Sequence, residues 1–547
     1  MIDGTYPLSE WLERLADPDS QVLGIVIANR GCDENEARRL AGWYLKLINS
    51  LKESYELADD ASVMLMRSPG RVNLLGTHVD HRGGRVNTIA INETILAASL
   101  RSDKIIRASS TDPAHMDDEA SFDDLLPDGP ISQEDWSNWT IAHSHSFGEK
   151  GWAGRWSTYV KAAVAYFVNR HRHDQDLHGF DVMVDGDIPR AAGLSSSSSL
   201  VIGTAQLMLR LNSLPIDEAQ FIEDCGRAEW YVGTRGGAGD HAAITWGRQG
   251  QVSHIDMLPM VPSWSPMPAG IKIIVFHSRV EAAKSGNAQS AFNQRVATYE
   301  VALSWVKRLR PKWAPLLEHI RDVNSETLGV HDTDIYEVLK QLPTRASRSE
   351  ILDALPDDVE AMERWFSLHD DPPDGYHVRD VCLYGLAECA RSRLLEGRLR
   401  EGDIDGAGEL LDLSHDGDRV TAIDGDSTRE AFNPGVDDDE IDGLIAALDS
   451  GDSELALVAQ VWHQPGGYTA SCEELDEMVD IARSIEGVAA AGLIGAGLGG
   501  CMLVMAADEV VDEVIDTMHS KYFTSRSLEP FAEVCVPVAG AGPMRLP

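Results

Sequence analysis

Residues 187–203, which read DIPRAAGLSSSSSLVIG, constrain the fold more than any other stretch, because they join two apolar runs through glycine and serine. The run 180–184 before them is typical of a strand, and the run 200–211 after them is compatible with a helix. At a helix start, free N–H groups and the helix dipole favour an anion, and glycine allows close approach. Serine hydroxyls add donors and can reach magnesium. The pattern predicts a phosphate-binding loop, and a flexible serine-rich linker is the alternative.

Two further motifs accompany this loop along the chain. Residues 67–84 read RSPGRVNLLGTHVDHRGG, and residues 495–501 read GAGLGGC. With the GLSSS segment between them, the three motifs lie in the order found in the GHMP kinases. The first one resembles the galactokinase signature of that superfamily, and the resemblance covers residues 60–310 and 375–545. It implies an α+β fold with the GHMP kinase two-domain architecture, in which the site lies between the domains.

The domain organisation follows from the length of 547 residues and from the resemblance. We expect a helical N-terminal extension over 1–60, without chemistry of its own. The resemblance implies an N-terminal ATP-binding domain over 61–268, similar to ribosomal S5 domain 2. It implies a ferredoxin-like C-terminal domain over 269–547. Insertions near 310–374 and 415–465 are expected within that domain, because the second one is strongly acidic and charge runs are usually solvated.

Composition limits the partners and the compartment. The formal net charge is −41, which argues against non-specific binding to nucleic acid or to anionic membranes. The seven cysteines are scattered without a Cys-x-x-Cys pair, as expected of reduced thiols in the cytoplasm. Residues 487–507 carry no charge and are long enough to cross a bilayer. Their six glycines favour strand–loop–strand or strand–loop–helix packing instead, so we expect a cytoplasmic protein.

Two residues are the candidates for catalysis. Asp240 follows a glycine-rich stretch, and from position alone it could equally be a helix cap. The resemblance assigns it as the catalytic carboxylate, because kinases of this family place that residue in a Gly-x-x-Asp segment here. Arg71 is expected in a loop or short helix after a strand at 63–66. It would keep Asp240 ionised and stabilise charge on the transferred phosphoryl group.

The resemblance also implies the nucleotide and metal ligands. Magnesium would be held by Ser197, or a neighbouring serine, and by Glu229. The glycine-rich motif near residue 495 would close over the phosphates or pack beneath the site. The implied ATP-binding residues are Gly193, Leu194, Ser195, Ser196, Ser197, Ser198, Ser199, Gly495 and Gly497.

The sugar-binding positions carried over from the family are Thr77, His78, Asp80, Gly237 and Phe292. Galactokinases usually have Glu at the position of Thr77, where it contacts the C6 hydroxyl of the sugar. A C6 carboxylate would be repelled by Glu and tolerated by Thr. Phe292 stands where Tyr is usual, and the DHRGG ending resembles plant-type galacturonate kinases. These departures favour an acidic or C6-altered sugar over galactose, and a pentose such as L-arabinose also remains open.

The predicted function is therefore ATP- and magnesium-dependent phosphorylation of the anomeric hydroxyl of galactose or a galactose-like sugar, with galacturonate as one candidate. The partners would be a small-molecule sugar and ATP, with no nucleic acid and no membrane. The alternative is a non-catalytic sugar and ATP sensor built on the same fold. The full-length serine loop, together with Asp240 and Arg71, argues against that alternative. The oligomeric state is not specified by the sequence.

Overall fold

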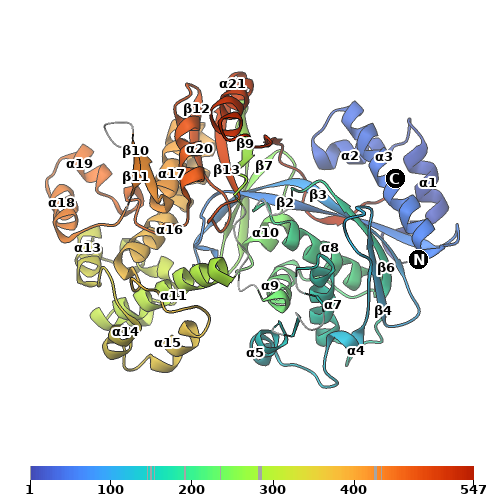
Figure 1. Cartoon of the computed structure of the whole chain (residues 1–547), viewed down its shortest axis with the longest axis horizontal. Helices are drawn as coiled ribbons and strands as arrows, with labels where there is room; N and C mark the ends of the chain where they lie inside the picture. Colours follow the sequence, from blue (N-terminus) through green and yellow to red (C-terminus); the bar gives the residue numbers. More distant parts are fainter. Residues whose placement is uncertain are drawn as a thin grey trace.

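The computed structural model describes residues 2–144, 146–147, 151–152, 154–189, 193–233, 236–280, 286–423, 428–432 and 434–547. Figure 1 shows two lobes, each built around its own sheet, with both chain termini beside the first lobe. The structure therefore combines helices and sheets in two layered units.

The larger sheet has the order β1-β2-β3-β6-β4-β5, with β15 pairing with β2 and a β7–β8 hairpin pairing with β3. Most of its pairs are antiparallel, and β4 runs parallel to β6. The strands are β1 (Thr5–Pro7), β2 (Ser62–Leu75), β3 (Val86–Leu100), β4 (Ile105–Ser110), β5 (Asp118–Ser121), β6 (Phe180–Gly186), β7 (Gln251–Asp256), β8 (Val261–Pro266) and β15 (Gly542–Pro543).

Both faces of this sheet are covered, and the alternation of side chains along β2 explains how. Met64 and Met66 point into a core that they share with helices from the region after residue 121. Val63 and Leu65 point to the other face, into a core that they share with the N-terminal helices. On the first face lie α4 (Phe122–Leu125), α5 (Gln133–Ser144), α7 (Ser157–His171), α8 (Ser196–Leu211), α9 (Glu218–Glu229) and α10 (Gly239–Thr245). On the second lie α1 (Leu8–Ala16), α2 (Val22–Arg30) and α3 (Glu34–Tyr55).

The second lobe is organised around an antiparallel sheet of order β12-β13-β9-β14. Its strands are β9 (Ile271–His277), β12 (Val488–Leu493), β13 (Cys501–Ala507) and β14 (Ala532–Cys535). Its helices include α11 (Gly286–Leu309), α16 (Val378–Glu401), α17 (Ile404–Asp418), α20 (Glu473–Arg483) and α21 (Val511–Met518).

Further helices and strands lie at the periphery of the second lobe (Figure 1). They are α12 (Ser325–Leu328), α13 (Asp332–Gln341), α14 (Arg348–Ala354), α15 (Val359–Phe366), β10 (Thr421–Ile423), β11 (Arg429–Ala431), α18 (Asp438–Asp449) and α19 (Ser453–Val458). Residues 488–507 form β12, a glycine-rich turn and β13, which is the strand–loop–strand packing expected from the glycines. Among the helices of the described residues, none is both long and apolar enough to span a membrane.

Three expectations from the sequence require correction. Strand β2 does not end near Pro69 but continues to Leu75 through an irregularity in its register at Ser68 and Gly70, so Arg71 lies on a strand. The acidic stretch from residue 415 is not solvated throughout, because His415 and Asp418 are buried at the end of α17. Residues 542–543, assigned to the C-terminal domain, pair instead with β2 of the first sheet.

Candidate active site

Two side chains from separate segments meet at Asp240, in the first turn of α10. Arg71 on β2 donates from Nε to Oδ1 and from Nη2 to Oδ2, each at 2.7 Å. The hydroxyl of Ser195 donates to Oδ2 at 2.5 Å. The Arg71 side chain is 9% exposed, whereas Asp240 is 37% exposed. The carboxylate is therefore held in one orientation by a bidentate arginine and still has open surface for a ligand.

Arg71 also fixes the serine loop. Its Nη1 donates to the carbonyl of Gly193 at 2.6 Å, and its backbone N–H donates to the carbonyl of Leu194 at 3.1 Å. Gly193 and Ser195 have positive φ angles of 71° and 57°, so the chain turns sharply before α8 begins at Ser196. Arg71 therefore contacts both the serine loop and Asp240 and fixes their relative position.

The serines at the start of α8 face Glu229, which ends α9. Ser198 Oγ donates to Glu229 Oε2 at 2.8 Å, and His241 Nε2 lies 2.9 Å from the same oxygen. Burial disfavours ionisation of Glu229, but bonds from His241, Ser198 and Ser197 outweigh burial and lower its pKa. One carboxylate with two hydroxyls is a hard oxygen donor set, which fits magnesium with water completing its shell. In the part of the chain that the structure describes, no cluster of three or more His, Cys, Asp or Glu residues forms a metal site.

Asp80 lies against the glycine-rich segment that leads to Asp240. A Cβ atom placed on Gly237 would lie 2.3 Å from Asp80 Oδ2, and one on Gly239 would lie 3.0 Å from it. Burial disfavours ionisation of Asp80, but hydrogen bonds from His81 and from backbone N–H groups outweigh it and lower its pKa to about 2. Asp80 is therefore a carboxylate at neutral pH, positioned by close backbone approach.

The two other predicted sugar residues in this motif are buried. Glu388 on α16 accepts the backbone N–H groups of Gly76 at 2.7 Å and Thr77 at 3.1 Å, and it is paired with the fully buried Arg391. His78 stacks on Tyr468 with ring centroids 4.2 Å apart. These contacts fasten residues 76–78 of the first lobe to the second lobe.

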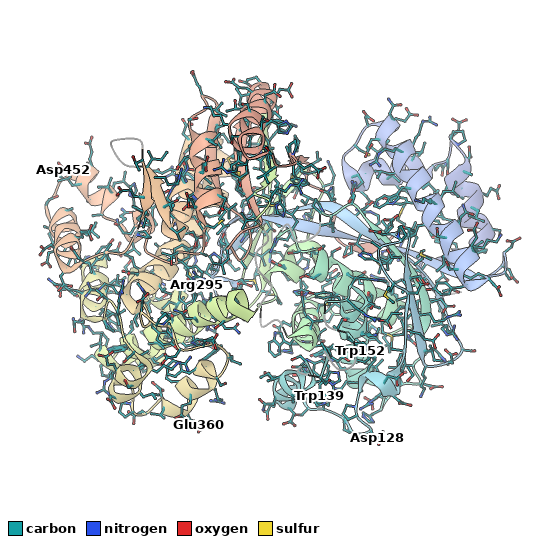
Figure 2. The ribbon with its side chains drawn as sticks, in the orientation of Figure 1. Asp128, Trp139, Trp152, Arg295, Glu360 and Asp452 are labelled. Atoms are coloured by element: carbon teal, nitrogen blue, oxygen red, sulfur yellow. The ribbon has the colours of Figure 1, made fainter. Side chains whose placement is uncertain are left out.

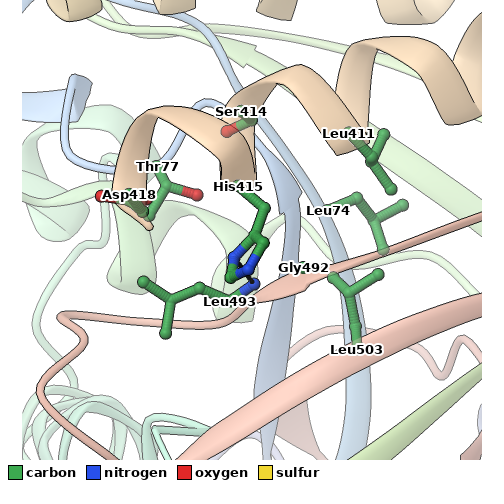
Figure 3. Close-up of a pocket in the computed structure, with 9 residues that line it drawn as sticks. All are labelled: Leu74, Thr77, Leu411, Ser414, His415, Asp418, Gly492, Leu493 and Leu503. Atoms are coloured by element: carbon green, nitrogen blue, oxygen red, sulfur yellow. Dashed lines mark hydrogen bonds between the residues drawn. The ribbon is translucent and has the colours of Figure 1, made fainter. Parts of the chain in front are cut away.

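Thr77 lines a small cavity between the lobes (Figure 3), together with Leu74, Leu411, Ser414, His415, Asp418, Gly492, Leu493 and Leu503. The cavity measures about 10 Å³, which is room for one water molecule. Asp418 Oδ2 lies 3.5 Å from His78 Nε2, so a buried carboxylate of the second lobe sits next to this part of the motif.

The remaining predicted residues are distributed over the second lobe. Gly495 packs against the serine loop, since a Cβ on it would lie 3.4 Å from the Gly193 carbonyl oxygen. Gly497 packs instead against Ala470. Phe292 is half-buried near the start of α11. Further along α11, Arg295, labelled in Figure 2, donates to the carbonyls of Tyr468 and Thr469 of the same lobe.

Sequence reasoning missed three residues of this arrangement. His241 was detectable only as the neighbour of Asp240, and its pairing with Glu229 depends on the packing of α10 against α9. Glu388 and Asp418 come from α16 and α17, more than 300 residues along the chain from the motif that they support. No local pattern marks either of them.

Three family models match parts of this chain. Residues 158–248 match the family model of the GHMP kinases N terminal domain, and residues 443–524 match that of the GHMP kinases C terminal. Residues 52–99 match the galactokinase galactose-binding signature.

Two solved structures illustrate the range of similarity. The Lactococcus lactis galactokinase complexed with galactose is 20% identical and has a TM-score of 0.60, over 90% of this chain and 99% of that one. The Methanococcus jannaschii mevalonate kinase is 12% identical with a TM-score of 0.43, over 87% of this chain and 98% of that one.

The chain thus carries regions that match both the N-terminal and the C-terminal domain of the GHMP kinases, and the α+β two-domain architecture predicted for it is confirmed. Within the superfamily, its galactose-binding signature is that of the galactokinase family.

Proposed function

We propose that the protein is an ATP-dependent sugar kinase that phosphorylates the anomeric hydroxyl of galactose or a galactose-like sugar. The observation that carries this proposal is the position of Asp240, which Arg71 and Ser195 hold beside the serine loop at the start of α8. A carboxylate, a fixed cation and a loop with free N–H groups are the components that phosphoryl transfer requires. The same components would serve no purpose in a serine-rich linker.

In the proposed reaction, Asp240 accepts the proton of the sugar's C1 hydroxyl or orients that hydroxyl. The C1 oxygen forms a bond to the γ-phosphorus while the bond between that phosphorus and the β–γ bridging oxygen breaks, and ADP leaves. Arg71 stabilises negative charge on the transferred group. The N–H groups and hydroxyls from Gly193 to Ser199 bind the phosphates.

Magnesium fits this arrangement through Glu229 with Ser197 or Ser198, whose oxygens already converge. When bound, the ion neutralises charge on the β- and γ-phosphates. We place the reaction in the cytoplasm, where ATP is available. The seven cysteines are all free thiols, as that compartment requires.

For the substrate, we propose a galactose-like sugar with an altered C6 group, with galacturonate as the first candidate. Asp80 and Gly237 would contact the ring hydroxyls, with His78 and Phe292 as further members of the site. Thr77 brings no charge of its own to the position where the family usually carries Glu. A C6 carboxylate would therefore meet less repulsion here.

An ATP-consumption screen tests the reaction. Galactose, galacturonate, glucuronate, L-arabinose and N-acetylgalactosamine would each be supplied with magnesium, at low and high salt. Turnover confined to a uronic acid would support the C6 argument, and turnover with galactose would identify an ordinary galactokinase. Silence on all five sugars at both salt concentrations would favour a non-catalytic sensor.

Asp240→Asn tests the proposed catalytic residue, because it removes the charge while keeping the volume. We expect turnover to fall by about 100- to 10,000-fold, the usual contribution of a positioned general base. Circular dichroism and thermal unfolding would serve as the folding control. Turnover within a few-fold of wild type would show that the base lies elsewhere.

A further inference from the structure

The N-terminal helices α1 and α2, and all but the last turn of α3, lie outside the family matches, which begin at residue 52. They pack on the face of the larger sheet opposite α7 and α8, and their apolar side chains share a core with Val63, Leu65, Ile95 and Ala97 of β2 and β3. Packing alone would account for their presence. One charged side chain goes further and reaches the start of the serine loop.

Arg30, the last residue of α2, turns towards Asp187. Its Nη2 donates to Asp187 Oδ2 at 3.1 Å, and its Nη1 lies 3.7 Å from Glu93 Oε1. The Arg30 side chain is only 10% exposed. The helix dipole favours a cation at the C-terminus of a helix. Gly31, with a φ angle of 64°, ends α2 directly after Arg30.

Asp187 is the first residue of the segment that carries the serine loop. It exchanges two bonds with Glu93 on β3: the Glu93 N–H donates to Asp187 Oδ1 at 2.6 Å, and the Asp187 N–H donates to the Glu93 carbonyl at 3.1 Å. The Glu93 carboxylate is fully buried and accepts from Arg67 Nε at 2.6 Å and from the hydroxyl of Tyr44 on α3. The N-terminal helices thus supply Arg30 and Tyr44 to this cluster.

The charges in this cluster depend on Arg30. Two carboxylates, Asp187 and Glu93, lie together, and a third belongs to Glu533 on β14, which accepts from Asn92 Nδ2 at 3.3 Å. Burial raises the pKa of Asp187, and the charge of Arg30 opposes that rise. Without Arg30, Asp187 would lose the cation bonded to it while Arg67 stayed paired with Glu93, and repulsion between Asp187 and Glu93 would displace the start of the loop.

The loop is therefore fixed at two points. Arg71 holds it at Gly193 and Leu194, and Arg30 holds its start at Asp187. We infer that Arg30 is a positioning residue for ATP, through which the N-terminal helices set the geometry of the phosphate-binding loop. This inference rests on the proposed function, because it takes residues 193–199 as the phosphate site.

Arg30→Met tests the inference, since methionine keeps much of the apolar stem and removes the charge. Isothermal titration of MgATP and of a non-hydrolysable ATP analogue would give Kd directly, without turnover. We expect the Kd for nucleotide to rise about tenfold and the KM for the sugar to stay unchanged, within the range known for residues that act without touching the ligand. Arg30→Lys keeps the charge and should show a smaller rise.

Two further variants isolate the mechanism. Asp187→Asn in the Arg30→Met background removes the repulsion and should recover most of the nucleotide affinity. Arg38→Met makes the same substitution in an exposed ion pair with Glu34 on the same N-terminal region, and should leave the Kd unchanged.

A lowered melting temperature with an unchanged nucleotide Kd in Arg30→Met would overturn the inference, because Arg30 would then act on stability alone. Equal weakening of sugar and nucleotide binding would overturn it as well. If the wild-type protein bound no MgATP, the proposed function would fail first, and the inference with it.

Discussion

A single methyl group added at Gly237 tests whether the backbone of this loop sets the position of Asp80. The new Cβ would lie 2.3 Å from Asp80 Oδ2, 3.0 Å from its Cγ and 3.3 Å from His81 Cβ. Carbon and oxygen atoms in contact normally stay about 3.5 Å apart, so the overlap is roughly 1 Å. Gly237 does not have a positive φ, so the effect of alanine would come from this overlap and not from backbone strain.

The cost follows from what holds Asp80 in place. Its carboxylate is bonded to His81, with Nδ1 3.0 Å from Oδ1, and to the N–H groups of His81 and Gly239. A shift of about 1 Å would weaken these bonds, and overpacking of this kind costs about 1–3 kcal/mol. We expect kcat/KM for the sugar to fall by up to about 100-fold, since a displacement of about 1 Å in a positioned group can cost that much. The KM for ATP should stay within about twofold, because the serine loop is not in this contact.

Gly236→Ala is the matched control. A Cβ on Gly236 would meet nothing within 4 Å, so the neighbouring methyl group should leave both KM values and the unfolding free energy nearly unchanged. Steady-state kinetics with each substrate varied in turn, and urea unfolding of both variants, would give the comparison. Equal behaviour of the two variants would refute the reasoning, because it would show that Asp80 is not confined by this backbone.

Three other perturbations follow from the same contacts. Thr77→Glu would place a second carboxylate near the buried Asp418 and should shift preference from uronic acids towards galactose; Thr77→Gln is the neutral control, and an unchanged ranking of sugars would refute the C6 argument. Because the pKa of Asp80 is lowered to about 2, its ionised form stabilises the fold fully above the unfolded pKa of about 4, and this stabilisation is lost as pH falls towards 2. Urea unfolding from pH 6 to 3 should therefore show that the difference in unfolding free energy between wild type and Asp80→Asn becomes smaller at lower pH. Glu388→Gln would leave Arg391 buried without its charge partner and should lower the free energy of unfolding by about 3–5 kcal/mol, measured in the same assay; a loss below about 1 kcal/mol would contradict that estimate.

Local motifs carried most of what could be predicted from the sequence. The strand–loop–helix around the five serines is found as β6, the loop and α8, because its apolar flanks and its glycine act over a few residues. The resemblance brought Arg71 and Asp240 together correctly in space, although 169 positions separate them. Their hydrogen bonds are described by the structure, and their chemical roles remain proposals.

Contacts between distant segments could not be predicted in this way. Arg30 was assigned to a packing extension because nothing near it in the sequence marks Asp187 as its partner. His415 and Asp418 lie in an acidic stretch and were expected in solvent, yet the packing of α17 against β12 buries them. A run of acidic residues predicts solvent exposure only when no other element packs against that segment. Here β12 packs against α17, and this strand follows about 70 residues later in the chain.

Within the first motif, neighbours in sequence have different structural positions. Residues 76–78 are fastened to the second lobe by Glu388 and by stacking on Tyr468, whereas Asp80 faces the backbone that leads to Asp240 in the first lobe. A substitution at 77 or 78 therefore acts on the junction of the lobes before it acts on a ligand, and a substitution at 80 acts on the loop of the candidate base. A change in sugar preference in a Thr77 variant should therefore be compared with the stability and sugar preference of Thr77→Gln. The effect of substituting Asp80 can be compared with that of Gly237→Ala, which moves the same carboxylate without removing it.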